Sequence, residues 1–229
     1  MAITFGNTST NATQGTTTWS HNSNGDFLLL GINSTSNAIS GVTYNGVAMT
    51  QIGTTLNFSA IGRFFYFWGL ASPASGANNI VVTGGANQNA AATSISGYSS
   101  NSGFNSGTTA SNPMTVSVTT TVDSAFVVGF GAFISYSSLG TGVSDVVGGV
   151  NGDANLRMIR STSAKSPAGS FSMSVNLTGS LLGGLIAVGI NPPATGPANL
   201  KSYNTNLKAN IKSIDTNLIA NIKSINTNA

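Results

Sequence analysis

The stretch GVTYNGVAMTQIG at residues 41–53 carries the clearest structural signal in the chain. Val42 and Tyr44 alternate with smaller residues as far as Asn45 and Gly46, and the apolar alternation resumes after them. Asn-Gly between two alternating segments is the strongest short signal for a β-hairpin, because both residues tolerate the positive φ of a type I′ turn. The stretch therefore predicts an antiparallel hairpin with a two-residue turn.

The segments on either side of this hairpin also have β character. Residues 113–121 and 170–178 alternate apolar residues with Ser, Thr or Asn, as antiparallel strands with one hydrated face do. Other segments are apolar on both faces and are expected to be central strands, or strands covered by a neighbouring subunit: 26–33, 62–70, 124–134 and 181–191. The sequence thus predicts an all-β antiparallel sandwich or jelly roll of about ten to twelve strands.

The aromatic run at 64–68 can serve either packing or binding. In a strand, Phe64, Tyr66 and Trp68 share one face, and Phe65 and Phe67 share the other. One set is expected to fill the core. The other set covers a second layer, contacts a neighbouring subunit, or forms a platform on which sugars stack, and Phe64, Tyr66 and Trp68 are the candidates for a subunit or glycan contact.

Charge is scarce and unevenly placed. Only 6% of the 229 residues are charged, and residues 1–198 carry as many basic as acidic side chains. The net charge of +3 belongs to residues 199–229, so the body has no basic patch for nucleic acid. The longest apolar run, at 181–190, is about half the length of a membrane-spanning helix. We expect neither nucleic acid nor membrane as a partner. Residues 1–11 lack the basic and apolar regions of a secretory signal, so synthesis in a cytoplasm is expected.

Groups that support catalysis or bind metals are few. His21 is the single imidazole and is expected in an exposed turn, and no cysteine is present, so neither a nucleophilic triad nor a zinc or iron site is expected. The glycine-rich segment 140–149 is expected to be a flexible loop. Of the four carboxylates of the predicted sandwich, Asp26 and Asp123 each stand just before an apolar segment, where Asp commonly begins a strand or closes a turn. Asp145 and Asp153 flank the segment VVGGVNG, and catalysis by any pair of these residues is not expected. We therefore expect no enzyme, no catalytic residue, no metal site and no cofactor.

Paired prolines in INPPATGPAN at 190–199 separate the predicted sandwich from a different kind of segment. We expect a sandwich domain at 1–191, a Pro/Gly hinge at 192–198 and a repeat tail at 199–229. The tail is nearly one phrase of eleven residues written three times, and its apolar residues step by 3, 4 and 4. These residues form the predicted assembly stripe: Leu200, Tyr203, Leu207, Ile211, Ile214, Leu218, Ile222 and Ile225.

The conformation of this tail is open at the level of sequence. Eleven residues per three turns fits a helix with right-handed supercoil. Asn, Ser, Thr and Ile are poor helix formers, so β or extended structure is favoured, with the helix as the alternative. A solubilising disordered tail is the third interpretation, but it would not need Leu and Ile at fixed spacing. One thin apolar stripe cannot bury itself, so the tail is interpreted as an assembly device.

Several motifs together resemble a recurrent β-sandwich family. They are VTYNGVAMTQIGT, RFFYFWGLASPASGANNIVVTGG and AAATSISGYSS, followed by an apolar strand before paired prolines, and the resemblance covers roughly residues 20–192. The family occurs in phage particle proteins and bacterial surface proteins. The chain has GLASPASG where the family often has Asn-Pro-Pro. The NIKSINTN phrase of the tail is similar to terminal repeats on phage and metagenomic surface proteins.

This resemblance implies a displayed structural or binding module without chemistry of its own. The expected function is that of a structural virion accessory protein, either a capsid decoration, a head fibre or a tail-associated protein, displayed on the particle exterior. Expected partners are other copies of the chain, with a trimer favoured, and virion proteins such as the major capsid or tail protein. The alternative is a glycan-binding adhesin module of a virus or cell surface, with host-surface glycans as ligands.

Overall fold

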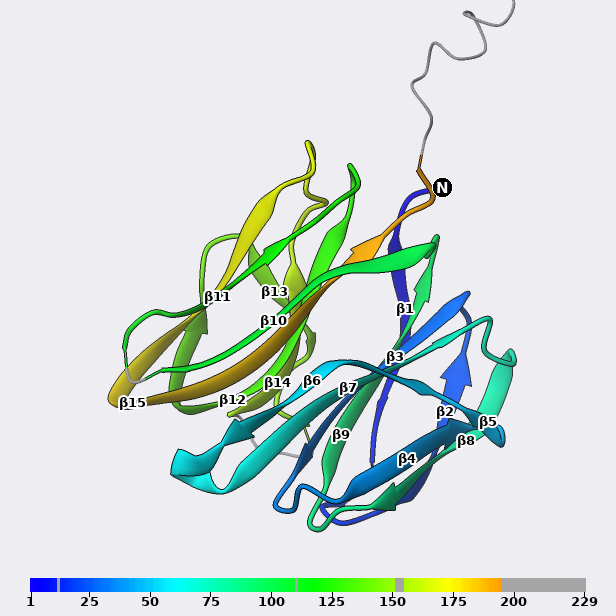
Figure 1. Ribbon diagram of the computed structural model, residues 1–229, viewed down its shortest axis with the longest axis horizontal. Coiled ribbons are helices and arrows are strands. Elements are labelled where there is room, and N and C mark those ends of the chain that lie inside the picture. The colour runs from blue at the N-terminus through cyan, green and yellow to red at the C-terminus, as the bar shows by residue number, and fades with distance from the viewer. Residues whose placement is uncertain (12, 110, 151–154, 195–229) are drawn as a thin grey trace, which may run out of the picture. The chain divides into compact units, whose positions relative to one another are not determined.

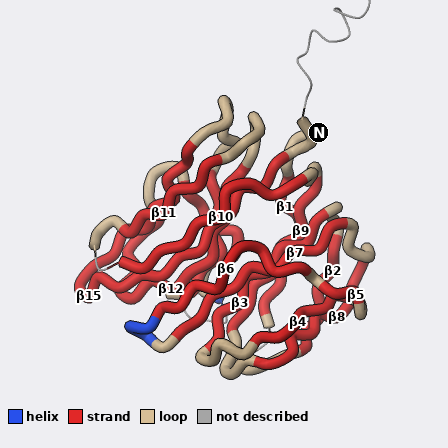
Figure 2. Tube along the Cα trace, viewed as in Figure 1, coloured by secondary structure: helices blue, strands red, loops and turns tan. Residues whose placement is uncertain are grey.

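The computed structural model describes residues 1–11, 13–109, 111–150 and 155–194. In this part of the chain almost all regular structure is antiparallel strand, with one turn of 3-10 helix, η1 (Ser59–Ile61), as Figure 2 shows. The predicted all-β sandwich is confirmed. The described residues contain fifteen strands, which is more than the sequence analysis expected.

The strands form three sheets (Figure 1). The middle sheet has the order β1 (Thr4–Thr10), β9 (Asn89–Ser96), β3 (Phe27–Ser34), β7 (Arg63–Ala71), β6 (Thr50–Phe58). The small sheet has the order β2 (Thr18–Ser23), β8 (Gly76–Gly84), β4 (Ile39–Tyr44), β5 (Val47–Ala48). The large sheet has the order β10 (Ser100–Thr109), β15 (Ser170–Asn191), β12 (Phe126–Leu139), β14 (Leu156–Ser161), β13 (Val143–Val147), and β11 (Met114–Thr119) also pairs with β15.

The middle sheet is buried on both faces, because its strands carry apolar residues at successive positions. All eight residues of β3 are buried. Leu28 and Leu30 point to one face and pack with residues of the small sheet, whereas Phe27 and Leu29 point to the other and pack with the large sheet. The segments expected to be central strands at 26–33 and 62–70 correspond to β3 and β7, so that expectation is confirmed.

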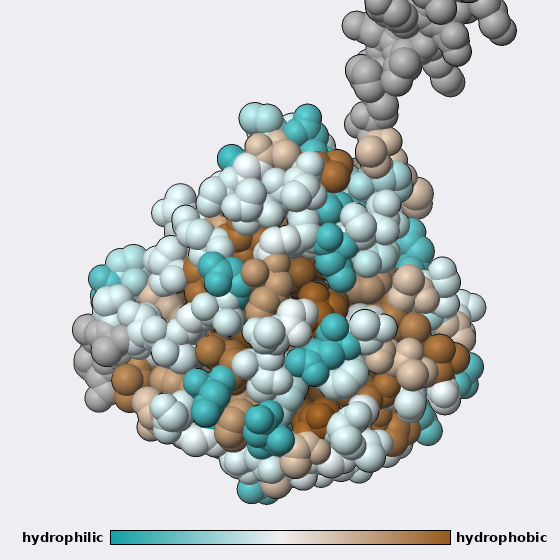
Figure 3. All heavy atoms as spheres, viewed as in Figure 1, coloured by the Kyte–Doolittle hydropathy of each residue, from teal (hydrophilic) through white to brown (hydrophobic). Residues whose placement is uncertain are grey.

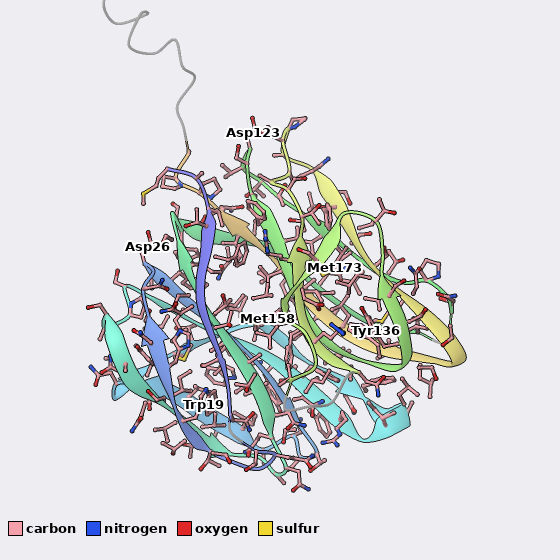
Figure 4. The ribbon with its side chains drawn as sticks, turned by 180° about the vertical axis from the view of Figure 1, so that it is seen from behind. Trp19, Asp26, Asp123, Tyr136, Met158 and Met173 are labelled. Atoms are coloured by element: carbon pink, nitrogen blue, oxygen red, sulfur yellow. The ribbon has the colours of Figure 1, made fainter. Side chains whose placement is uncertain are left out.

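A third core lies on the far face of the large sheet, because this sheet folds back on itself. The second half of β15 pairs with β10 and with β12, whereas the first half pairs with β11 and with the end of β12. The register of β12 shifts on both sides of Tyr136, next to Ser135, whose φ is 60°. Such irregularities bend a strand. Met158 and Met173, labelled in Figure 4, belong to the cores on opposite faces of the large sheet.

The predicted hairpin is confirmed, although its second strand is short. Asn45 and Gly46 have φ of 51° and 75°, and Tyr44 pairs with Val47 across the turn. After β5 the chain leaves the small sheet for β6 of the middle sheet. The second arm therefore serves as a crossover between layers.

The expectation of a loop at 140–149 is wrong in part. Val143–Val147 is the edge strand β13, which pairs with β14, and the Val143 side chain is buried. The strand is short, and the glycines on either side of it made the segment resemble a loop in the sequence. The last strand, β15, ends at Asn191, and the chain divides into units Met1–Pro193 and Ala194–Ala229. Most of the expected hinge and the whole assembly stripe lie outside the described residues.

Close approach between the middle and large sheets depends on a glycine. Gly31 of β3 faces the ring of Phe130 in β12, and a Cβ atom at Gly31 would overlap that ring. Phe130 in turn lies near Phe65 and Phe67, with ring centroids 6.2 and 6.5 Å away. The absence of a side chain at Gly31 therefore makes the recess that the Phe130 ring occupies.

We predict that Gly31→Ala lowers the free energy of unfolding by about 1–3 kcal/mol, because overpacking forces the two sheets apart. Gly41→Ala is the matched control, since Gly41 also lies in a strand but a Cβ atom added there would meet no heavy atom within 4 Å. It should be neutral or stabilise by about 0.4–1 kcal/mol. Denaturant unfolding of both variants checks this, and equal effects would contradict the account.

Candidate functional site

The aromatic run of β7 is covered on both faces within the chain. Tyr66 is 2% exposed and Trp68 is 8% exposed, and both pack with Phe64 in the core beneath the small sheet. Phe65 and Phe67 lie in the opposite core, against the large sheet. For Tyr66 and Trp68 the structure shows the second layer, so these two rings are not exposed to a subunit or a glycan. Phe64 is only partly buried, and its contact with a subunit or a glycan stays a prediction.

His21 was expected in an exposed turn, and that expectation is wrong. It lies in β2 and is 1% exposed. Its Nδ1 lies 2.9 Å from Ser9 Oγ and its Nε2 lies 2.9 Å from Ser94 Oγ. The polar neighbourhood WSHNSNGD suggested a loop, but alternation within β2 turns Trp19, His21 and Ser23 inward together. Figure 4 shows Trp19 in this layer.

The hydrogen bonds around His21 form a chain of neutral groups. Trp19 Nε1 donates to Ser9 Oγ at 3.3 Å, and Ser94 Oγ donates to Ser23 Oγ at 3.4 Å. Burial lowers the pKa of His21 from 6.5 to about 4, because the charged imidazolium would lose its hydration. No carboxylate of the described residues is bonded to His21, so the orienting acid of a Ser-His-Asp triad is missing from this group.

The described carboxylates have structural partners. Asp26 accepts hydrogen bonds from the backbone N–H groups of Gly97 and Tyr98 at 3.0 and 3.1 Å, and Asp123 accepts one from Ala168 at 2.6 Å. Figure 4 shows Asp26 and Asp123 away from the labelled core methionines. The turn positions expected for these two residues are confirmed, whereas Asp153 lies outside the described residues.

Asp145 is paired with a cation on the large sheet. Arg157 Nη1 lies 2.7 Å from Asp145 Oδ2, and its guanidinium lies 4.1 Å from the centre of the Tyr136 ring. The pairing joins the edge strand β13 to its neighbour β14. It is a local contact within one sheet.

One pocket brings together polar side chains that sequence analysis did not single out. We call it the end pocket, because it lies at the ends of β3, β7, β9 and β14 and beside the middle of β12; its volume is about 210 Å³. Its polar lining comes from Asn33, Arg63, Asn89 and Asn155. Its apolar lining comes from Ile61, Ala132, Ile134 and Leu156.

The end pocket is placed by strand register. Asn33 and Asn89 face each other across β3 and β9, and Arg63 is the first residue of β7. Asn33 lies two positions after Gly31, on the face of β3 that packs against the large sheet, so it is the polar end of that face. Asn33 is 2% exposed. A polar residue closing an apolar alternation was the only signal in the sequence for this site.

Two polar atoms of the end pocket lack partners. Asn33 Oδ1 and Arg63 Nη1 are buried and make no hydrogen bond to the described residues. The other buried polar atoms in this condition belong to Trp68, Ser144 and Arg157, none of which lines the pocket. In the end pocket, buried polar atoms without hydrogen-bond partners therefore line a volume large enough for a small ligand.

A second pocket, of about 280 Å³, lies beside the turn that joins β9 to β10. Tyr98 stacks on Phe27 there, with centroids 3.8 Å apart, and Thr50, Gln51 and Asn101 add polar lining. Neither Gln51 nor Asn101 has a buried atom without a partner. This pocket is explained by the local packing of the turn.

Comparisons of the chain with protein-family models, with curated proteins and with solved structures found no match. Within the described residues, no three His, Cys, Asp or Glu side chains gather as metal ligands would. The same residues include no helix with the length and hydropathy to cross a membrane.

The buried histidine makes stability depend on pH. Because the pKa of His21 is about 4 in the folded chain and 6.5 unfolded, the unfolded state binds the extra proton as pH falls. We predict that the free energy of unfolding decreases between pH 6.5 and 4, by about 3 kcal/mol in total.

His21→Gln is the variant that isolates this effect, because it cannot titrate. At pH 7 its free energy of unfolding should be about 1–2 kcal/mol lower than that of the parent chain, because the hydrogen bonds to Ser9 and Ser94 are altered. Its stability should change less between pH 6.5 and 4, since the contribution of the His21 imidazole is absent. A variant that keeps the full slope of the parent chain would rule out His21 as its source.

Proposed function

We propose that the chain is a structural accessory protein of a phage particle, either a capsid decoration, a head fibre or a tail-associated protein. In this proposal the sandwich is displayed on the particle exterior, and the repeat at 199–229 provides assembly and attachment. The observation that carries the proposal is the surface of the sandwich. Among the described residues, the exposed large hydrophobic side chains are Met1 and Val47, at 77% and 54%.

Association through apolar contact therefore has little to use on the sandwich itself. On the face drawn in Figure 3, apolar residues show mainly in recesses between polar or weakly polar ones. The repeat, by contrast, carries eight apolar residues at fixed spacing, from Leu200 to Ile225. Its residues also belong to a separate unit, Ala194–Ala229. These facts support an assembly role for the repeat.

The particle setting rests on further support from the sequence. Residues 20–192 resemble sandwich modules of phage particle proteins. Residues 1–198 have no net charge and therefore no excess of basic side chains that would attract nucleic acid. Partners in this proposal are other copies of the chain, as a trimer, and a capsid or tail protein. A second candidate is a glycan-binding adhesin, which the end pocket favours.

We predict that a chain ending at Pro193 folds but does not self-associate, because the strands are complete at Asn191. Sedimentation should show an oligomer for the full chain and a monomer for the truncated one, with the same thermal unfolding of the sandwich. Leu207→Ser combined with Ile214→Ser and Ile222→Ser should also give monomers.

The matched control replaces Lys208 and Lys212 by Gln, which alters charge but keeps the stripe. This control should still assemble, because the apolar contacts of the stripe are unchanged and do not depend on the two lysine charges. Monomers for both the full and the truncated chain, with equal recovery in purified particles, would reduce the repeat to a tether and reject the proposal.

A further inference from the structure

The end pocket combines two buried groups of complementary hydrogen-bonding character. Asn33 Oδ1 accepts hydrogen bonds, and Arg63 Nη1 is a cationic donor. Both are buried, and neither has a partner in the described residues. A buried polar atom without a partner destabilises a fold, because its hydration is lost and nothing replaces it. Two such atoms lining one pocket point to a bound group that supplies the partners.

The chain's described carboxylates do not supply the partner of Arg63. Asp26 and Asp123 accept hydrogen bonds from the backbone, and Asp145 pairs with Arg157. A guanidinium that lines a pocket is best matched by a carboxylate, whose two coplanar oxygens accept hydrogen bonds from its N–H groups. The ligand therefore carries an anionic oxygen.

Asn33 Oδ1 adds a second requirement. Its partner must donate a hydrogen, and a carboxylate at neutral pH cannot do so. A hydroxyl on the same ligand can. A single water could bridge neighbouring groups, but the pocket of about 210 Å³ is several times larger than the roughly 30 Å³ that one water occupies.

Besides four polar residues the pocket has an apolar wall, which suits a small saturated ring. Ile61 and Leu156 contribute to this lining from η1 and β14, and Ala132 and Ile134 contribute from β12. Ligand pockets commonly combine such an apolar wall with a few polar groups that fix orientation. The volume of the pocket, its apolar wall and its two unpartnered polar atoms together fit a small ring that carries a carboxylate and hydroxyls.

We propose that the end pocket binds one acidic sugar unit of the uronic acid type. Its carboxylate accepts hydrogen bonds from Arg63, and one of its hydroxyls donates to Asn33 Oδ1. This inference deepens the second candidate function, the adhesin. It does not depend on the repeat, since the pocket lies wholly within Met1–Pro193.

Calorimetric titration of the full chain tests the ligand chemistry with three probes. D-glucuronate has both a carboxylate and ring hydroxyls, D-glucose has only hydroxyls, and acetate has only the carboxylate. Glucuronate should bind saturably, and each of the other two should bind about tenfold more weakly or worse, since each lacks one partner. A short oligouronate, tested beside the free sugar, shows whether a polysaccharide end also enters; binding of either form supports the proposal.

Variants test the two residues. Asn33→Leu and Arg63→Gln should each weaken glucuronate binding about tenfold or more. Asn33→Leu should not lower the midpoint of thermal unfolding, because it replaces an unpartnered oxygen by an apolar group of similar size. Arg160→Gln is the matched control: Arg160 is at the other end of β14, with its guanidinium 4.7 Å from the centre of the Phe5 ring, and binding should be unchanged.

Two results would overturn the inference. One is the absence of saturable glucuronate binding up to about 10 mM, which would leave water as the occupant. The other is equal glucuronate affinity in the parent chain, Asn33→Leu and Arg63→Gln. Arg63→Gln, at a half-buried strand start, keeps the test valid if Asn33→Leu fails to fold. Either result leaves the assembly proposal standing, because truncation after Pro193 tests that separately.

Discussion

The middle sheet cannot leave either face in water, and the rest of the sandwich depends on this constraint. Leu28, Leu30 and Ile32 of β3 are fully buried beneath the small sheet. Leu29 is fully buried beneath the large one. Burying one such side chain contributes about 1.5–3 kcal/mol, so exposing three would remove several kcal/mol from a net stability of about 5–15. Two covering layers are thus a condition of folding. The crossover from β5 to β6 and the recess at Gly31 both serve that stacking.

Polar groups inside the sandwich fall into two kinds. Around His21, each ring nitrogen has a serine within 2.9 Å, and the pKa stays low, so the group behaves as a satisfied, neutral part of the core. In the end pocket, Asn33 and Arg63 retain buried atoms without partners. The contrast separates structure from a candidate site better than residue type does. Residue type alone would favour the histidine as a functional group, yet its ring nitrogens are hydrogen-bonded, whereas the Asn33 amide and the Arg63 guanidinium line a pocket with buried atoms that lack partners.

Local alternation in the sequence predicted the strands and the Asn45-Gly46 turn, because both depend on neighbouring residues. It did not predict which sheets would stack, since alternation assigns residues to two faces without naming what covers each face. The burial of His21 depends on Ser9 and Ser94, which are 12 and 73 residues away. The end pocket likewise joins residues from β3, β7, β9 and β12. Such groupings follow from long-range register, which no short window of sequence contains.

The order of strands along the chain also bears on how the protein is made. The middle and small sheets use residues up to Ser96, whereas β10, β11 and β12 all pair with β15, which ends at Asn191. During synthesis the first half can therefore complete its pairing early, while the large sheet waits for its last strand. Until the large sheet has formed, Phe65 and Phe67 are exposed to water, and an exposed apolar face of this kind is prone to aggregation. Because non-local strand pairing is slow, we expect the closure of the large sheet by β15 to be the slower step of folding.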